Sequence, residues 1–330
     1  MQTAKKVLFI IQDVHMPSSR IRVLNLLPWL DRNGVDCSVV FFPRHMRQRW
    51  FLYGKLRHFD IVYLQKRLLS PVDSFLLRRC SRTLIFDFDD AIYFRHDSHP
   101  DPISRARYVK FKFLIRRCDY VVAGNRILAA YASQFNRRVT VIPSSVKTEN
   151  IPLKNHNPRE RARVIGWIGT GRNLSHLKLI ESALQRLAKR HPFELKVISD
   201  RPLFMEGVKV SFVPWRLATQ EEEVASLDIG LMPLPSSRYA EGKCAYKALQ
   251  YMAAQVPPVC SDVGINAEVI QDGKEGFVVK STGDFYQALE VLITDGKLRK
   301  EMGERAREKV RQSYSEEVIG AQLAEFLLSV

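Results

Sequence analysis

The sequence has few cysteines and no long apolar run. Its five cysteines are scattered, with no CxxC pair and no histidine at metal-binding spacing, which argues against a disulfide framework and a zinc site. No apolar run reaches the ~18 residues that a membrane-spanning helix needs. The first run, VLFII (7–11), is shorter than the ~7 residues of a signal-peptide core, and Asp13 follows it. We therefore expect reduced thiols, a cytoplasmic protein and a first buried strand at 7–11.

Other signatures are missing as well. No short-period repeat and no low-complexity segment is present. No strand-like segment is followed by GxGxxG, the motif that binds dinucleotides. A dinucleotide-dependent oxidoreductase is therefore the enzyme class that the sequence favours least.

Positive charge is abundant, and it lies in one half of the chain. Residues 1–160 contain 28 Lys and Arg against 13 Asp and Glu, whereas residues 161–330 contain 23 against 22. The N-terminal half is therefore expected to face an anionic partner, either a membrane surface, nucleic acid or a phosphorylated substrate.

Short apolar runs alternate with helical patterns along the whole chain, which predicts parallel, doubly wound sheets. The expected strands are 7–11, 37–42, 60–65, 83–88, 120–124 and 139–143, then 163–169, 194–199, 210–215, 228–235 and 257–262. Helices are expected over 18–34, with Ser18 or Ser19 as its cap, and over 174–190, 219–227, 244–254, 283–292, 296–313 and 316–329.

The rhythm restarts after the polar linker 150–163, so the chain is expected to form two Rossmann-like domains, 1–160 and 161–314. Residues 315–330 are predicted to form a helix that packs back across the boundary. Ligands of such sheets bind outside the carboxyl ends of the strands.

The stretch GKCAYKALQYMAAQVPPVCSDVGINAEVI (242–270) combines an apolar helix with cations. Lys243, Lys247 and Gln250 follow at i, i+4 and i+7, on a different face from the apolar stripe. Gly242 allows a close approach of the backbone to a ligand. Two lysines at a helix N-terminus favour a phosphate or diphosphate, although a solvated lysine face would give the same spacing.

This stretch resembles the donor-binding signature of glycosyltransferase family 4, the retaining nucleotide-sugar transferases of GT-B fold. SSRIRVLNLLPWL (18–30), LIFDFDDAIYF (84–94), VVAGNRILAAYA (121–132), IGWIGTGRNLSHLKLI (165–180) and DIGLMPLP (228–235) are similar to segments of the same family, in the same order. The resemblance implies an N-terminal acceptor domain, a C-terminal donor domain and no required metal or other cofactor.

The resemblance also assigns residues. It places the diphosphate contacts at Lys243 and Lys247, with donor contacts from the turn Thr170, Gly171 and Arg172 and from Gly264, Asn266 and Glu268. The wider family has a Glu-x7-Glu pair, and its two positions are Gly242 and Gln250 in this sequence. The amide of Gln250 remains able to hydrogen-bond a ribose.

The acidic segment FDFDDAIYFRHD (86–97) follows a predicted buried strand. Asp89 and Asp90 are predicted to line the cleft beside the acceptor, where a helix cap is the alternative. Asp87 and Asp89 spell DxD, a weak metal-binding motif, and no catalytic metal is expected. Further acceptor-side candidates are Ser18, Ser19, Arg20, His96 and Asn125, each of which could equally serve a turn or a surface.

Aromatic side chains are interleaved with cations in residues 45–59 and 104–120. This pattern suits the headgroup zone of an anionic membrane, and it also suits RNA. Peripheral association with the inner face of the membrane is the preferred interpretation over a nucleic-acid partner.

Together these features predict a retaining glycosyltransferase that moves a sugar from a UDP- or GDP-sugar to a cell-envelope glycan or a lipid-linked acceptor. The alternatives are a nucleotide-sugar epimerase of the same fold and a basic nucleic-acid-binding protein without enzyme activity.

Overall fold

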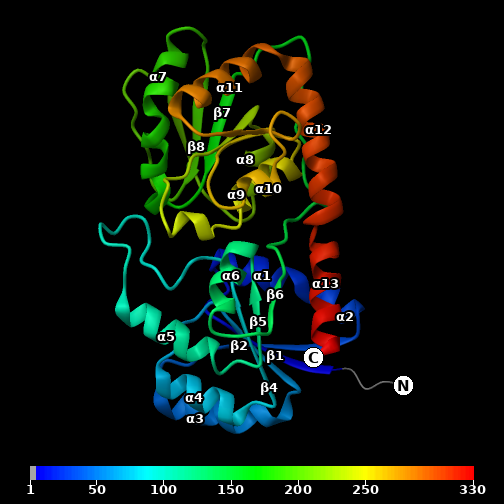
Figure 1. Ribbon diagram of the computed structural model, residues 1–330. Coiled ribbons are helices and arrows are strands. Elements are labelled where there is room, and N and C mark those ends of the chain that lie inside the picture. The colour runs from blue at the N-terminus through cyan, green and yellow to red at the C-terminus, as the bar shows by residue number, and fades with distance from the viewer. Residues whose placement is uncertain (1–4) are drawn as a thin grey trace. The chain divides into compact units, whose positions relative to one another are not determined.

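The computed structural model describes residues 5–330 and divides them into two compact units (Figure 1). The first unit comprises the chain up to Ser145, the segment Glu241–Cys244 and the C-terminal residues Tyr314–Val330. The second comprises Val146–Ala240 and Ala245–Ser313. The chain therefore passes between the units near residues 145, 240, 244 and 313.

The first unit is built on a six-stranded parallel sheet in the order β2-β1-β3-β4-β5-β6. Its strands are β1 (Lys5–Ile11), β2 (Val35–Phe41), β3 (Ile61–Gln65), β4 (Thr83–Phe88), β5 (Tyr120–Ala123) and β6 (Val139–Val141). The central strands β1, β3 and β4 are buried along nearly their whole length, as expected of a sheet covered on both faces.

Helices cover both faces of this sheet. They are α1 (Pro17–Arg22), η1 (Leu24–Leu26), α2 (Leu27–Arg32), α3 (Met46–Lys55), η2 (Leu56–His58), α4 (Pro71–Cys80), α5 (Arg105–Ile115), α6 (Arg126–Ser133) and α13 (Glu316–Ser329). One face packs Phe9 and Ile85 against Leu323 of α13, and the other packs Phe86 and Phe88 against Phe111 of α5. Helices α3, α4 and α5 follow one another as neighbours, and α13 lies beside α2 (Figure 1).

The second unit has a six-stranded parallel sheet in the order β12-β11-β10-β7-β8-β9. Its strands are β7 (Val164–Ile168), β8 (Glu194–Ser199), β9 (Val210–Pro214), β10 (Ile229–Met232), β11 (Pro258–Ser261) and β12 (Phe277–Val279). Around it lie η3 (Gly171–Ile180), α7 (Glu181–Ala188), α8 (Gln220–Ala225), η4 (Ala240–Gly242, which leads out of the unit), α9 (Tyr246–Ala253), α10 (Asn266–Val269), α11 (Thr282–Thr294) and α12 (Gly296–Ser313).

The predicted doubly wound α/β architecture is confirmed, and every predicted strand is present. Strand β12 was missed, because three residues are too short for a periodic signal. The helix expected over 174–190 is a 3-10 helix as far as Ile180 and becomes α-helical only at Glu181.

The cap predicted at Ser18 or Ser19 is wrong. Helix α1 begins at Pro17 after Met16, so both serines lie in its first turn and are buried. Proline suits this first helical position because its missing N–H would have no partner there. In the described chain, from residue 5 onward, no helix combines the length and the apolarity needed to cross a bilayer.

Candidate functional site

The strand orders locate one candidate site in each unit. In a doubly wound sheet, ligands bind at the carboxyl ends of the strands where the order reverses direction. This switch point lies between β1 and β3 in the first unit and between β7 and β10 in the second.

At the first switch point, polar side chains that follow β1 contact the end of β3. Ser19 Oγ lies 3.3 Å from Gln65 Oε1, and Gln12 Nε2 donates to the carbonyl of Lys66 (3.1 Å). Ser18 Oγ and Gln65 Nε2 are buried and have no hydrogen-bond partner among residues 5–330. Buried polar atoms are rarely unpaired, so these two atoms retain hydrogen-bonding capacity that a bound hydroxyl group could use.

Lys66 lies at this switch point and brings the two nominated aspartates together. Its Nζ is 2.7 Å from Asp89 Oδ1 and 2.5 Å from Asp90 Oδ2. Burial lowers the pKa of Lys66, but the two carboxylates outweigh burial and the net shift is upward, so the ammonium group stays charged. Burial raises the pKa of Asp89, and Lys66 opposes that shift only in part. The cluster therefore carries two carboxyl groups held by one cation.

The backbone of Lys66 is held in an uncommon conformation. Its φ is 53°, in the left-handed region that non-glycine residues rarely adopt, and its amide donates to the Asp87 carbonyl (2.7 Å). Such conformations persist where the surroundings enforce them, and they are concentrated at functional sites.

A second ion pair lies behind this cluster. Arg22 Nε donates to Asp87 Oδ2 (3.2 Å), its Nη2 pairs with Asp87 Oδ1, and its Nη1 donates to the Ile142 carbonyl (2.7 Å). Both side chains are buried. The DxD carboxylates Asp87 and Asp89 are thus engaged with two different cations. Among residues 5–330, no three His, Cys, Asp or Glu side chains are grouped as metal ligands.

Asn125 anchors the segment Glu241–Cys244 to the first unit. Its Oδ1 caps α6 by accepting from the Leu128 amide (2.9 Å), and its Nδ2 donates to the carbonyls of Gly242 (3.1 Å) and Lys243 (3.3 Å). Cys244 Sγ donates to the Asp89 carbonyl (3.2 Å). The turn alternative for Asn125 thus fits its Oδ1, while its Nδ2 fixes the segment that precedes α9.

Gly242 is packed within the first unit. A Cβ at this position would lie 2.7 Å from the Cβ of Ala91 and 2.9 Å from the Ala91 amide. The glycine therefore allows the segment to lie against residues that directly follow the acidic cluster.

At the second switch point, Lys247 is placed by packing. Its Nζ lies 5.7 Å from the ring centroid of Trp167 in β7, a cation–π contact. A Cβ on Gly169 would come within 2.9 Å of Lys247 Cε, so the side chain passes directly beside the end of β7. The lysine nominated for the diphosphate therefore lies at the switch point of the second sheet.

Tyr251 joins the two strands that part at this point. Strands β7 and β10 are paired only at Ile165–Ile229 and Gly166–Gly230. Beyond these pairs, the buried Tyr251 hydroxyl accepts from the Ile168 amide (3.0 Å) and donates to the Leu231 carbonyl (3.1 Å). Tyr251 lies one helical turn after Lys247, so the same contacts hold α9 in position against both strands.

The prediction that the two lysines share one helix face is wrong. Helix α9 begins at Tyr246, after Ala245, whose φ of 53° is left-handed and interrupts the helix. Lys243 therefore precedes the helix and belongs to the first unit, whereas Lys247 belongs to the second. Gln250 does follow Lys247 on α9, and it is half-buried. The predicted apolar stripe is buried as expected.

The turn after β7 is occupied by local contacts. Asn173 Nδ2 donates to Thr170 Oγ1 (3.3 Å), and the Gly171 amide donates to Asp200 Oδ1. That amide hydrogen bond holds the pKa of Asp200 below its usual range. The Gly171 amide would bind a phosphate only if Asp200 moved away. Arg172 is exposed.

The loop after β11 is stabilised by its own asparagine. The buried Asn266 donates through Nδ2 to the Ser261 carbonyl (2.9 Å), and Ser261 Oγ accepts from the Leu234 amide (2.9 Å). Gly264 has a φ of 66°, which glycine adopts without strain. Asn266 thereby shapes the loop, and Glu268 is exposed on it.

The remaining acceptor-side candidates make local contacts. Arg20 Nη1 donates to the His15 carbonyl (2.6 Å), and His96 Nδ1 accepts from the Ser98 amide (3.1 Å). Sequence reasoning did not nominate Lys66, Arg22 or Tyr251. Lys66 directly follows a predicted strand and could have been found by that rule, whereas Arg22 and Tyr251 lie inside helical patterns that carry no such signal.

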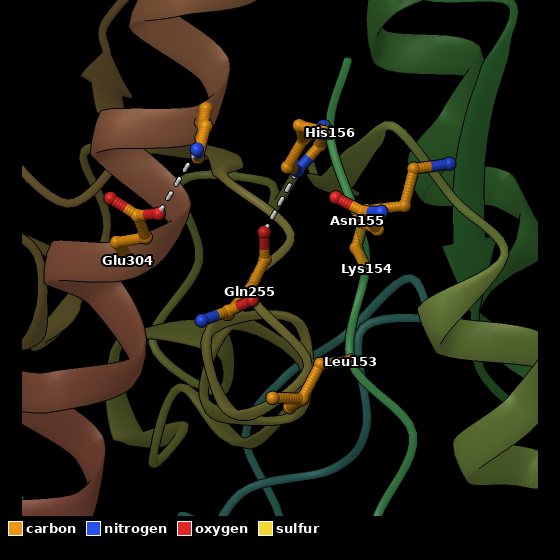
Figure 2. Close-up of a pocket in the computed structure, with 7 residues that line it drawn as sticks. Leu153, Lys154, Asn155, His156, Gln255 and Glu304 are labelled. Atoms are coloured by element: carbon orange, nitrogen blue, oxygen red, sulfur yellow. Dashed lines mark hydrogen bonds and ion pairs between the residues drawn. The ribbon is translucent and has the colours of Figure 1, made fainter.

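A separate hollow of about 220 Å³ lies in the second unit, between residues 153–156, Gln255 and α12 (Figure 2). Several of its polar side chains make hydrogen bonds or ion pairs within the unit. His156 Nε2 donates to the Gln255 carbonyl (2.9 Å), Lys154 pairs with Asp228 (2.6 Å), and Lys300 lies 3.9 Å from Glu304. Gln255 follows the C-terminus of α9, so this hollow is at the opposite end of that helix from Lys247. These contacts attach the linker to the unit.

Known proteins resemble this chain in sequence and in fold. Residues 162–295 match the family model Glycosyl transferases group 1. N-acetyl-alpha-D-glucosaminyl L-malate synthase from Bacillus anthracis is 28% identical over 179 residues, which are 51% of this chain and 46% of that protein. The match thus spans less than half the length of the curated relative.

Solved structures match nearly the whole chain. The Anabaena protein HepE, determined with UDP and glucose, has a TM-score of 0.73 at 14% identity over 99% of this chain and 100% of that one. Sucrose-phosphate synthase from Thermosynechococcus elongatus has a TM-score of 0.76 at 13% identity and covers 98% of each chain. The fold is GT-B. Each of the two sheets of this GT-B protein has one switch point.

Proposed function

We propose that this GT-B protein is a retaining glycosyltransferase that transfers a sugar from a nucleotide-diphosphate sugar. The observation that carries the proposal is the position of Lys247 at the switch point of the second sheet, where nucleotide ligands of doubly wound folds bind. The family match lies largely within this unit, and the structural neighbour HepE was determined with UDP and with UDP-glucose, which favours a uridine donor.

In the proposed reaction, the acceptor oxygen forms a bond to the anomeric carbon of the sugar, and the bond from that carbon to the β-phosphate oxygen breaks. Negative charge develops on that phosphate oxygen. Lys247 is held beside β7 by Trp167 and by the Tyr251 contacts, so little reorganisation is needed when that charge appears. Lys243 supplies a second cation from the segment before α9. The leaving phosphate assists deprotonation of the acceptor, so neither a protein nucleophile nor a metal ion is part of the proposal.

The first switch point is proposed to bind the acceptor. Asp89 and Asp90 can accept hydrogen bonds from sugar hydroxyls, while Lys66 keeps both carboxyl groups in place. Ser18 Oγ and Gln65 Nε2 add two further polar atoms. This set suits a neutral, hydroxyl-rich molecule, so we propose a cell-envelope glycan or the glycan of a lipid-linked acceptor. We also propose that the enzyme acts at the inner face of the membrane.

A thermal-shift panel of UDP-, GDP-, CDP- and dTDP-sugars in EDTA tests the donor. A ligand at about 100 times its dissociation constant stabilises the folded protein by about 2.7 kcal/mol. The expected result is a shift with one nucleotide class that the Lys243→Met/Lys247→Met variant loses. Equal shifts in the wild type and the variant would contradict the assigned phosphate contacts.

Product analysis separates transfer from the alternatives. A transferase releases the nucleoside diphosphate only when an acceptor is present, whereas an epimerase returns a nucleotide sugar. The comparisons favour neither the epimerase nor a nucleic-acid-binding protein.

A further inference from the structure

The outward faces of α3 and α4 expose large apolar side chains. Trp50 and Phe51 in α3 are 58% and 67% exposed, and Phe75 in α4 is 54% exposed. Met46 and Val72 extend the same two faces. We refer to these five residues as the α3–α4 face. Soluble proteins rarely group exposed aromatic rings in this way without a partner.

Polar contacts hold helices α3 and α4 together. The buried carboxylate of Asp73 in α4 accepts from Arg49 Nη1 (2.9 Å) and from the Tyr53 hydroxyl (2.8 Å), both in α3. Ser70 Oγ, at the N-terminus of α4, also donates to it (2.7 Å). The helices lie next to each other in the first unit (Figure 1). Residues 49 and 53 thus face α4, which directs Trp50 and Phe51 outward.

Cations surround the apolar side chains. Residues 44–82 contain ten Lys and Arg against two Asp. Both aspartates are engaged, since Asp73 pairs with Arg49 and Asp60 pairs with Arg82 (3.0 Å). Arg47, Lys55 and Arg79 are exposed on the outward side of the two helices. The α3–α4 face therefore presents aromatic rings within a positive field.

We propose that the α3–α4 face docks the protein on an anionic lipid bilayer, with the side chains of Trp50, Phe51 and Phe75 inserted at the headgroup level. Aromatic rings favour this interfacial zone, and each nearby cation gains from the negative surface potential. Lys55 Nζ lies 4.1 Å from the ring centroid of Phe51, so a ring and a charge act as one amphipathic unit. The same face also exposes Met46 and Val72, which have no ring to stack on a base, so it suits a bilayer better than an RNA.

The neighbouring helix α5 extends this surface. Tyr108 and Val109 are exposed on it, beside the exposed cations Arg105, Arg107 and Lys110. The docking proposal rests on the proposed function in one respect, because docking would bring the enzyme to a lipid-linked acceptor. Vesicle binding is nevertheless measured without donor or acceptor.

Co-sedimentation of the full chain with vesicles tests the proposal. The vesicles contain phosphatidylglycerol and phosphatidylcholine, or phosphatidylcholine alone. The expected result is binding to the anionic vesicles that weakens as salt is raised, and the Trp50→Ser/Phe51→Ser/Phe75→Ser variant should bind about tenfold more weakly or worse. Phe204→Ser is the matched control, because Phe204 is 87% exposed in the second unit.

A charge variant provides the independent arm. Arg47→Glu/Lys55→Glu/Arg79→Glu should lose binding to anionic vesicles, whereas Lys280→Glu/Lys297→Glu in the second unit should keep it. Wild-type binding by the aromatic variant, or preference for neutral vesicles, would overturn the proposal. Binding to RNA without binding to vesicles would also overturn it. The aromatic variant should still show the thermal shift with a nucleotide sugar. The docking proposal can therefore fail without affecting the donor proposal.

Discussion

The two switch points use different means to place polar groups at the carboxyl ends of parallel strands. In the first unit, buried charges do this work, through Arg22 with Asp87 and Lys66 with Asp89 and Asp90. In the second, Lys247 lies over an indole ring, and a tyrosine hydroxyl joins the parting strands.

This difference indicates what each switch point can bind. Two cations and three carboxyl groups are engaged with one another at the first switch point, which suits hydrogen bonds to a neutral molecule rather than an added anion. Lys247 is positioned by ring packing and by α9, and its positive charge suits an anion. This difference agrees with the proposed neutral acceptor in the first unit and the proposed diphosphate in the second.

The largest effect is expected from Arg22→Met in the first unit. Asp87 would be left buried and unpaired, so we expect the free energy of unfolding to fall by about 3–5 kcal/mol. Urea denaturation measures it. Arg22→Met/Asp87→Leu should recover much of the loss, because no unpaired charge remains. A single variant as stable as the wild type would show that the pair does not hold the switch point.

The second prediction concerns Lys247→Met, which keeps the packing on Trp167 and removes the charge. Loss of one preorganised group that stabilises the leaving phosphate should lower kcat by about 10²–10³-fold. The melting temperature should stay close to that of the wild type. Steady-state transfer assays measure the change, and Lys280→Met is a matched lysine control. Wild-type turnover by the folded variant would refute the role of Lys247.

The third prediction uses pH and the linker of the second unit. Burial lowers the pKa of His156 from its ordinary 6.5 to about 4. The unfolded chain therefore binds a proton more readily, so stability present above pH 6.5 is lost as the pH falls towards 4, by about 3 kcal/mol. Urea denaturation at pH 7 and at pH 4.5 measures the loss.

His156→Gln is the matched variant, since its side-chain amide can still donate to the Gln255 carbonyl. Its stability should depend less steeply on pH over this interval. An unchanged slope would assign the acid sensitivity to other groups. In the first unit the sign is opposite for Asp89, whose raised pKa gives stability at low pH that is lost as pH rises.

The smallest effect is expected from Tyr251→Phe. It leaves the Ile168 amide and the Leu231 carbonyl buried without their partner, which should lower the free energy of unfolding by about 1–3 kcal/mol. Transfer should fall as well, because α9 loses its attachment beside Lys247. Tyr286→Phe in α11 is the control for loss of a hydroxyl. Equal effects of the two substitutions would mean that the strand-joining contact has no special role.

Much of the fold was readable from the sequence. Short runs such as VLFII and TLIFDF are apolar throughout, which fits strands covered on both faces, and helical spacing between them predicts the crossovers. The difference in charge between the two halves was also visible, and it led to the segment that contains Trp50 and Phe51. Local signals of this kind survive in any tertiary context.

The composition of the site was only partly readable. Asp89, Asp90 and Lys247 were nominated from their places beside predicted strands and helices. Lys66 was not, because its partners lie more than twenty residues away and only the pairing of β3 with β4 brings them together. Tyr251 was taken as part of an apolar helix, since the split between β7 and β10 is a property of the sheet.

The amino-acid sequence was enough to predict two doubly wound sheets, a basic N-terminal half and a lysine on an apolar helix, because each depends on residues close together in the chain. Only the tertiary structure decided which charges meet at the first switch point and which hydroxyl joins the strands of the second. It also separated Lys243 from Lys247, since packing of Gly242 and Cys244 in the first unit and a left-handed Ala245 end the segment before α9 begins. Long-range contacts of this kind are selected by the packing of whole elements, and no local pattern records them.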